Sequence, residues 1–300
     1  MQARWEKLLG GASLEGLTAA VQRSSTTIDT VRVERWLLTV ESGIRIPCVL
    51  LQPEQANPQQ PCVVAVCSQG KDHLLKERAG EIAILIERGA AVCLVDPRGI
   101  GESKLGDSHG RRSSATSHSS TELMLGGTLP SRQLRDVRLV LNWLRTRPNL
   151  PANRFALWGE SLVPPNADDA PFRTPRDDDQ SLPAPSEPQA PLLALLTGLF
   201  EDDVAAIYTA GGLVSWRALL DSYLVLAAHD SLVPGALTAG DIADLTMSQS
   251  PATRVRMEGL VDGWNRRATD VSRISLPTAS KFVEWEAARH SSATWLVPAK

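Results

Sequence analysis

Two short and almost continuous apolar runs constrain the fold of this chain more than any other feature. They read CVVAVC at 62–67 and AAVCLVD at 90–96, and such runs are typical of strands covered on both faces. Between them, residues 74–89 carry apolar side chains at helical spacing and end at Gly89, which suits a helix C-terminus. A strand, a helix and a strand at this spacing predict a parallel, right-handed βαβ unit.

The alternation of strands and helices continues along the chain. Residues 31–40 and 44–53 alternate apolar and polar side chains around a Glu-Ser-Gly turn, which predicts an antiparallel hairpin. We expect further strands at 154–159, 203–212, 253–262 and 293–297, and further helices at 132–148, 192–200, 214–222 and about 270–290. The whole pattern predicts an α/β fold, with a mostly parallel sheet, an N-terminal antiparallel hairpin and helices on both faces.

The length of the chain is compatible with one domain over residues 1–300. Residues 163–191 interrupt it, because they are rich in proline and aspartate and nearly free of large apolar side chains. We expect a flap or loop there. Its consecutive Asp177, Asp178 and Asp179 fit a solvated acidic loop better than a metal site, because adjacent carboxylates seldom converge on one ion.

Charge and hydropathy exclude several classes of partner. A net charge of −3 offers no basic surface for nucleic acid or for an anionic membrane. No apolar run is long enough to span a bilayer, and residues 1–20 lack the order of a signal peptide, which fits a cytoplasmic protein or a secreted one whose leader is removed. The four cysteines lie in apolar strand-like runs, so we expect buried free thiols at Cys48, Cys62, Cys67 and Cys93.

A serine at the end of a predicted strand is the first candidate for chemistry. The stretch RFALWGES places Ser161 just after that strand, with Gly159 at the first glycine of a GxSxG nucleophile elbow. Val163 stands at the second glycine and two prolines follow, so we expect the chain to leave into a long loop and not directly into a helix. Ser161 is therefore either a nucleophile or a residue that caps a turn.

A second turn, VDPRGIGES at 95–103, follows another predicted strand and lies at the same expected edge of the sheet. It lacks a GxGxxG pattern leading into a helix, which argues against a dinucleotide site. With VCSQGK, LRDVRLVLNWLRTRP and RFALWGES, it gives the chain a resemblance to the α/β-hydrolase superfamily over about residues 30–265. More narrowly, the chain is similar to bacterial acetyl xylan esterase-like carbohydrate esterases, some of which carry two hydrolase domains in tandem.

The resemblance implies a serine esterase with Ser161 as nucleophile. An oxyanion hole is expected from backbone amides of the loop at Gln69 and Gly70 and from Leu162, the residue after the nucleophile. The superfamily places its acid after the next-to-last strand, where Asp262 stands, and Asp230 is a second choice.

The base is the open point of this assignment. The superfamily places a histidine after the last strand, but only three residues follow the strand expected at 293–297. Among the five histidines, His290 is nearest to the expected position, and His229 adjoins a loop that could approach the sheet edge. The other three are His73, His109 and His118.

Two functions from different classes stay open. The first is a serine hydrolase of small or carbohydrate-linked acyl esters that needs no metal or organic cofactor. The second is a degenerate hydrolase-fold module that binds or packs against a partner hydrolase domain or a second copy, favoured by Val163 and the missing terminal histidine. An acidic nucleophile at Glu160 is set aside, because that residue should face the other side of the sheet.

Overall fold

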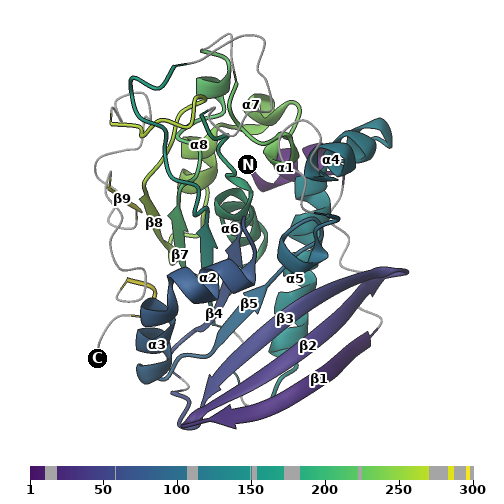
Figure 1. Ribbon diagram of the computed structural model, residues 1–300, viewed down its shortest axis with the longest axis vertical. Helices are drawn as coiled ribbons and strands as arrows, with labels where there is room; N and C mark the ends of the chain where they lie inside the picture. The colour runs from purple at the N-terminus through teal and green to yellow at the C-terminus, as the bar shows by residue number, and fades with distance from the viewer. Residues whose placement is uncertain are drawn as a thin grey trace.

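The structure is a computed structural model that describes residues 1–10, 19–57, 59–106, 114–148, 150, 154–171, 183–221, 225–269, 283–286 and 295–297. Within these ranges one nine-stranded sheet has the order β1-β2-β3-β5-β4-β6-β7-β8-β9 (Figure 1). Neighbouring strands are antiparallel from β1 through β3 to β5 and parallel from β5 onward. The expected fold class is therefore confirmed, while a single domain over 1–300 stays a prediction. The strands are β1 (Ala19–Ile28), β2 (Val31–Glu41), β3 (Ile44–Pro53), β4 (Cys62–Cys67), β5 (Val92–Val95), β6 (Phe155–Glu160), β7 (Val204–Ala210), β8 (Arg254–Glu258) and β9 (Val283–Glu286).

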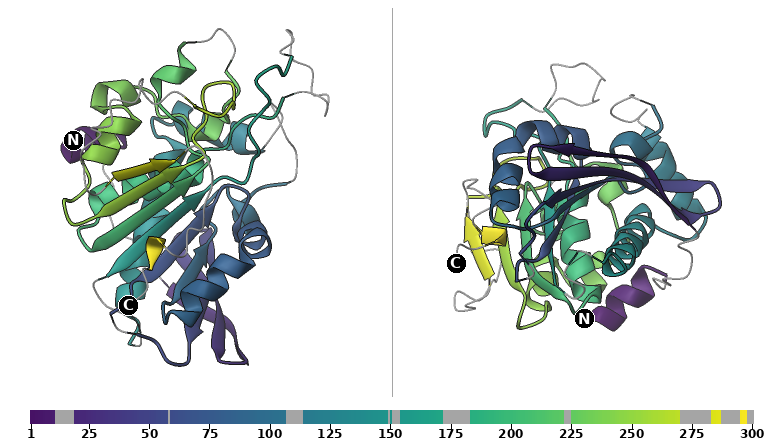
Figure 2. Two further views of the ribbon diagram at one scale, coloured as in Figure 1. Left: turned by 90° about the vertical axis from the view of Figure 1, so that its left-hand side faces the viewer. Right: turned by 90° about the horizontal axis from the view of Figure 1, so that it is seen from below.

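Helices cover both faces of this sheet, which explains its continuous apolar strands (Figures 1 and 2). On β4, Val63 packs in one core with Leu85 of α3, whereas Val64 packs in the other with Leu141 of α5 and Leu193 of α6. The described helices are α1 (Gln2–Leu8), α2 (Lys71–Glu77), α3 (Ala79–Glu87), α4 (Ser114–Met124), α5 (Leu129–Arg145), α6 (Gln189–Phe200), α7 (Ala236–Ala239) and α8 (Ile242–Met247), with 3₁₀ turns η1 (Gly101–Ser103), η3 (Arg217–Leu219) and η4 (His229–Ser231).

Several expected elements differ from the structure. Strand β1 was not expected, because its ten residues are all exposed and show no apolar face. The helix expected at 74–89 is the pair α2 and α3, interrupted at Arg78. Within the described residues 214–221 of another expected helix, the structure forms only the short turn η3, and α4 lies in the expected loop 104–128. In each place a local pattern was either absent or overridden by tertiary packing.

The C-terminal prediction was wrong, and the difference bears on the candidate base. Residues 283–286 form β9, which pairs parallel with β8, where a helix was expected. Trp295 and Leu296 form a helical turn where a final strand was expected. The segment around 283–290 has spacing that fits an amphipathic helix, but pairing with a sheet edge decides its structure. His290 thus comes shortly after the last described strand in the chain.

Candidate active site

The parallel strands of the sheet end together along one line. Cys67 of β4 lies opposite Glu160 of β6, and the pairing continues through Ala210 and Glu258 to Glu286 of β9. In open α/β sheets, ligands bind outside these carboxyl ends. The loops that leave this line carry most of the predicted site residues, so the candidate active site lies at this edge.

Ser161 directly follows β6 but does not sit in a sharp elbow. Its main-chain N–H donates to the carbonyl of Ala210 (2.9 Å), as a residue that prolongs the strand would. Among the described residues, the non-glycine positions with positive φ are Asp29 and Asn265, so Ser161 has an ordinary backbone conformation. The residue is 1% exposed. The strained strand-to-helix turn of a complete GxSxG nucleophile elbow is therefore not the conformation of this structure.

After Ser161 the chain leaves into a loop, as the sequence indicated. Asn166 donates through its main-chain N–H to the carbonyl of Asn265 (2.7 Å), so the segment runs toward the loop after β8. Helix α6 begins at Gln189 and not at 192, because Pro191 is tolerated in a first helical turn. Asp177, Asp178 and Asp179 lie outside the described residues.

The start of α6 nevertheless packs tightly against the end of β6. A Cβ on Gly159 would collide with the carbonyl of Ala190, in the first turn of α6. The main-chain N–H of Ala190 donates to the hydroxyl of Ser68, just beyond β4. The glycine of the expected elbow thus permits a close approach of helix and strand, even though the helix does not follow the serine directly.

Glu160 faces away from the candidate site, as expected. Its carboxylate accepts hydrogen bonds from Arg78 (2.6 Å) and from the indole of Trp158 (3.0 Å). The bonds from Arg78 to this 1%-exposed carboxylate raise the pKa of the guanidinium, against the effect of its own burial. Strand alternation then directs the next side chain, Ser161, toward the opposite side.

The three expected oxyanion residues are brought together, but their amides differ in state. The Leu162 N–H donates to the side-chain Oε1 of Gln69 at 2.6 Å, and the Gly70 N–H donates to the carbonyl of Cys67 at 2.8 Å. The main-chain N–H of Gln69 interacts with the thiol of Cys67, which lowers the pKa of that thiol against the larger effect of its burial. One amide therefore faces a thiol, one is covered by a side chain, and Gly70 is occupied by its own turn.

Asp96 fixes the loop that carries these amides. Its carboxylate accepts from the main-chain N–H (2.7 Å) and the ammonium (2.9 Å) of Lys71 and from the main-chain N–H of Glu102 (2.9 Å). Burial alone would lower the pKa of Lys71, but the charges and hydrogen bonds of Asp96 and Glu102 raise it. A Cβ on Gly70 would lie 2.6 Å from the Cα of Gly101, so these two loops touch through their backbones.

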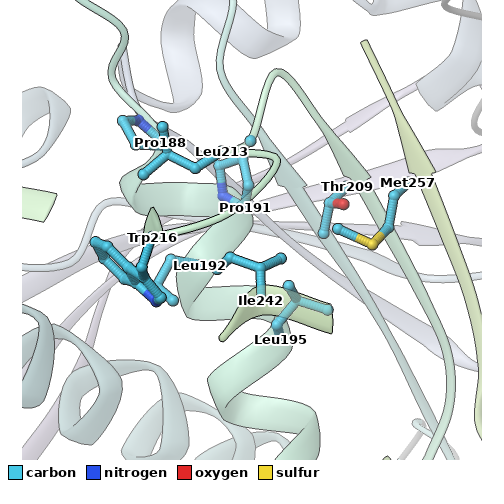
Figure 3. A pocket seen from close by; sticks show the side chains of 10 residues that line it. Pro188, Pro191, Leu192, Leu195, Thr209, Leu213, Trp216, Ile242 and Met257 are labelled. Carbon is cyan, nitrogen blue, oxygen red and sulfur yellow. The ribbon is translucent and has the colours of Figure 1, made fainter. Parts of the chain in front are cut away.

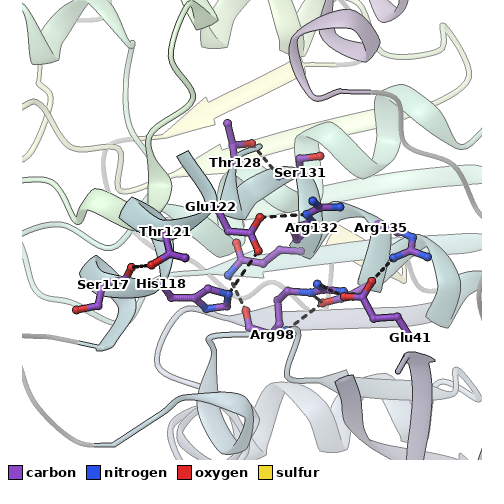
Figure 4. A network of polar contacts seen from close by, with 12 residues as sticks. Glu41, Arg98, Ser117, His118, Thr121, Glu122, Thr128, Ser131, Arg132 and Arg135 are labelled. Carbon is purple, nitrogen blue, oxygen red and sulfur yellow. Dashed lines mark hydrogen bonds and ion pairs between the residues drawn. The ribbon is translucent and has the colours of Figure 1, made fainter. Parts of the chain in front are cut away.

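The PRGIGES turn has a structural role through its arginine. The guanidinium of Arg98 donates to both carboxylate oxygens of buried Asp136 (2.8 and 2.6 Å) and to Glu41, which also binds Arg135 (Figure 4). Burial alone would lower the pKa of Arg98, but these bonds raise it. The network ties the loop after β5 to α5 and β2, and so holds the Asp96 loop in place.

Asp262, the expected acid, lies in the loop after β8. Its Oδ1 accepts from the main-chain N–H groups of Trp264 (2.8 Å) and Arg266 (2.9 Å), which fixes the carboxylate. No donor among the described residues binds its Oδ2. Asp262 lines a cavity of about 800 Å³, together with Arg217 and Arg267. One oxygen is thus anchored and the other is free to take a further donor.

Asp230, the second choice, is buried elsewhere at the same edge. It accepts a hydrogen bond from the Gln189 side chain at the start of α6. Burial, with a contribution from the charge of Glu187, raises its pKa from 3.8 to about 6. Asp230 is therefore easier to protonate than an ordinary aspartate. A firmly ionised carboxylate would orient a catalytic histidine better.

The described histidines are not directed at Ser161. The Nδ1 of His229 lies 3.1 Å from the hydroxyl of Ser119 on α4. His118 lies 3.8 Å from Glu122 on the same helix (Figure 4), and His73 is exposed on α2. His109 and His290 lie outside the described residues.

Two features of the edge were missed from the sequence. Glu187, which accepts from the Gln69 side chain at 2.6 Å, stands in the proline-rich stretch and carries no local pattern. Ser119, the partner of His229, lies in α4, which was read as a loop. Neither contact has a signal in sequence spacing, because each joins segments far apart in the chain.

Other sites of chemistry find little support within the described residues. The apolar cavity between α6, β7 and α8 holds only about 10 Å³, too little for an ester substrate (Figure 3). No described group of three or more histidine, cysteine or acidic residues could bind a metal ion.

The four cysteines are buried and free, as predicted, and burial raises the pKa of Cys67 to about 12. Among the described helices, none has the length and apolar character to cross a bilayer.

The order of the strands and the helices on both faces of the sheet give the chain the α/β-hydrolase fold of known esterases. An inferred acetyl xylan esterase from Bacteroides fragilis superposes with a TM-score of 0.68 at 13% identity, over 95% of this chain and 72% of that one. Acetyl xylan esterase 1 from Thermoanaerobacterium gives 0.56 at 15% identity, over 96% and 87%. A methylesterase gives 0.60 at 15% identity, over 95% of this chain and 56% of that one. No protein-family model and no curated protein matches the sequence.

Proposed function

We propose that this chain is a serine hydrolase of acyl esters, small or carbohydrate-linked. The observation that carries the proposal is the common register of the strand ends. Ser161 follows β6, Asp262 follows β8 and His290 follows β9, which is the chain order of the α/β-hydrolase triad. Likeness to acetyl xylan esterases supports the ester class of substrate.

The proposed reaction uses groups of this chain alone. His290 takes the proton of Ser161 as its Oγ attacks the ester carbonyl, and Asp262 holds the imidazole through the oxygen that the backbone leaves free. The N–H groups of Gln69 and Leu162 stabilise the oxyanion. The alcohol leaves with the proton from His290, and water then releases the acid from the acyl-enzyme by the same steps in reverse order. This chemistry requires no metal or organic cofactor.

The described conformation is a closed one for this reaction. Ser161 is 1% exposed, and the Leu162 N–H is occupied by Gln69. Catalysis therefore requires that Ser161 become accessible and that the Gln69 side chain move off the Leu162 N–H. The buried serine without a strained elbow also favours a second function, a non-catalytic hydrolase-fold module that packs on a partner hydrolase domain or a second copy.

Labelling and turnover separate the two functions. A fluorophosphonate should label Ser161 of the wild-type chain, and Ser161→Ala should abolish both labelling and turnover of p-nitrophenyl acetate. Ser248→Ala, which removes a hydroxyl bonded only within α8 and its end, is the matched control. Absence of label on the wild-type protein at high reagent concentration would establish the module and refute the hydrolase.

A further inference from the structure

The side chain of Gln69 occupies the position that an ester carbonyl would take in the proposed reaction. Its Oε1 lies 2.6 Å from the Leu162 nitrogen and accepts the hydrogen bond that this amide would donate to an oxyanion. We propose that Gln69 is an intramolecular stopper of the oxyanion hole and that Glu187 holds it closed. The inference rests on the proposed function of Ser161 and adds a residue pair that governs access to its site.

The orientation of the Gln69 amide follows from its neighbours. Two donors, the Leu162 N–H and the thiol of Cys67 (3.6 Å), point at one end of the amide. The carboxylate of Glu187 lies 2.6 Å from the other end. A flipped amide would place NH₂ against both donors and its oxygen against a carboxylate, so the carbonyl must face Leu162.

Glu187 is anchored independently of Gln69. The preceding residue, Ser186, donates through its main-chain N–H to the carbonyl of Leu226 (2.8 Å), and its carbonyl accepts from Ala228 (2.8 Å). The following residue, Pro188, leads into α6. Because the backbone on both sides is fixed, Glu187 keeps its place before α6 whether or not the Gln69 side chain is present.

The stopper has a chemical cost for a substrate. An incoming ester oxygen replaces Gln69 Oε1 on Leu162, so that bond is exchanged for a similar one. To admit the substrate, the Gln69 amide must swing away from Leu162, and its charge-assisted bond to Glu187 then breaks. The substrate offers no bond in its place. Losing a bond of that kind lowers reactivity by roughly tenfold to a hundredfold. Removing the stopper should therefore activate the site.

Two variants test this directly. Gln69→Ala keeps the main-chain N–H of residue 69 and removes the side chain, and Glu187→Gln weakens the bond that holds it. We expect Gln69→Ala to raise the rate of fluorophosphonate labelling of Ser161 roughly tenfold or more. Most of this increase should come from a lower reagent concentration at half-maximal labelling rate. Glu187→Gln should raise it by a smaller factor. Gln59→Ala and Glu54→Gln, both on the exposed loop before β4, are matched controls.

Hydrogen exchange of the Leu162 amide, read by NMR on protein labelled with ¹⁵N-leucine, reports the stopper without relying on catalysis. Faster exchange in Gln69→Ala, together with faster labelling, supports the proposal. Unchanged exchange overturns it, and so does measurable labelling of Ser161 that is no faster in Gln69→Ala than in the wild type. If exchange is faster but no variant is labelled at Ser161, the cover on the amide is upheld and the serine hydrolase function fails.

Discussion

Arg78 and Glu160 form an ion pair beneath the candidate site, with the guanidinium 2.6 Å from a carboxylate that is 1% exposed. Glu160 immediately precedes Ser161 in the chain. The pair thus fixes the last residue of β6 on the side of α2 and α3 and sets the direction in which the serine leaves the sheet.

Removing the arginine should destabilise the fold strongly. Arg78→Ala leaves the Glu160 carboxylate buried with the indole of Trp158 as its neighbouring donor. We expect a loss of about 3 kcal/mol in the free energy of unfolding, measured by urea denaturation. Adding Glu160→Gln to that variant should restore part of it. Arg132→Ala, at a more exposed pair with Glu122, should cost less than about 1 kcal/mol. Equal losses in the two arginine variants would contradict a special role for the buried pair.

Gly159→Ala should destabilise the protein by displacing α6. The added methyl group would collide with the backbone carbonyl of Ala190, which cannot rotate away as a side chain can. We expect a loss of roughly 2 kcal/mol or more in the free energy of unfolding, by thermal or urea denaturation. Gly80→Ala in α3 is the matched control, because nothing lies near the added methyl group. It should stabilise the protein by about 0.5–1 kcal/mol. A neutral Gly159→Ala would show that α6 does not rest on β6.

Asp230 should make stability depend on pH in a defined direction. Burial and the charge of Glu187 raise its pKa from 3.8 to about 6, so the folded protein holds this proton where the unfolded chain has lost it. Its stabilising contribution is complete below about pH 4 and is lost as the pH rises through about 6.

The test compares wild type with Asp230→Asn, which cannot titrate. Their difference in free energy of unfolding should shift by on the order of 2 kcal/mol in favour of the variant between the two ends of that range. Urea denaturation at several pH values gives the difference. A constant difference would show that Asp230 titrates alike in the folded and unfolded chain.

Much of the fold could be predicted from the sequence because its strands carry strong patterns. The runs at 62–67 and 90–96 are apolar on both faces, and the structure places helices on both sides of them. Strand β1 has no such pattern, since its polar residues are held in the sheet only by pairing with β2. The conformation of such an edge strand is determined by pairing with its neighbour and not by the pattern of its own residues.

The candidate site was less predictable for a related reason. The position of Ser161 after a central strand follows from local patterns, but its conformation depends on contacts between distant segments. Gln69 was expected to contribute its main-chain amide, and the structure adds that its side chain covers Leu162. The contact with Glu187 joins residues 118 positions apart, and no periodicity reports a pairing of that range.

The last prediction concerns the base and the acid of the proposed hydrolase, and it follows from the strand β9 found where a helix was expected. With β9 at Val283–Glu286, His290 follows the final described strand, whereas a ring nitrogen of His229 is engaged by Ser119. His290→Ala should therefore lower kcat for p-nitrophenyl acetate about a thousandfold or more, and His229→Ala only a few-fold.

The same comparison applies to the two acids. Asp262→Asn should lower kcat by a similarly large factor, because the amide no longer stabilises the imidazolium, while Asp230→Asn should keep most activity. Circular dichroism and thermal denaturation of each variant check that the losses arise in a folded protein. A large loss in His229→Ala with none in His290→Ala would move the base to the α4 side of the edge and refute the triad proposed here.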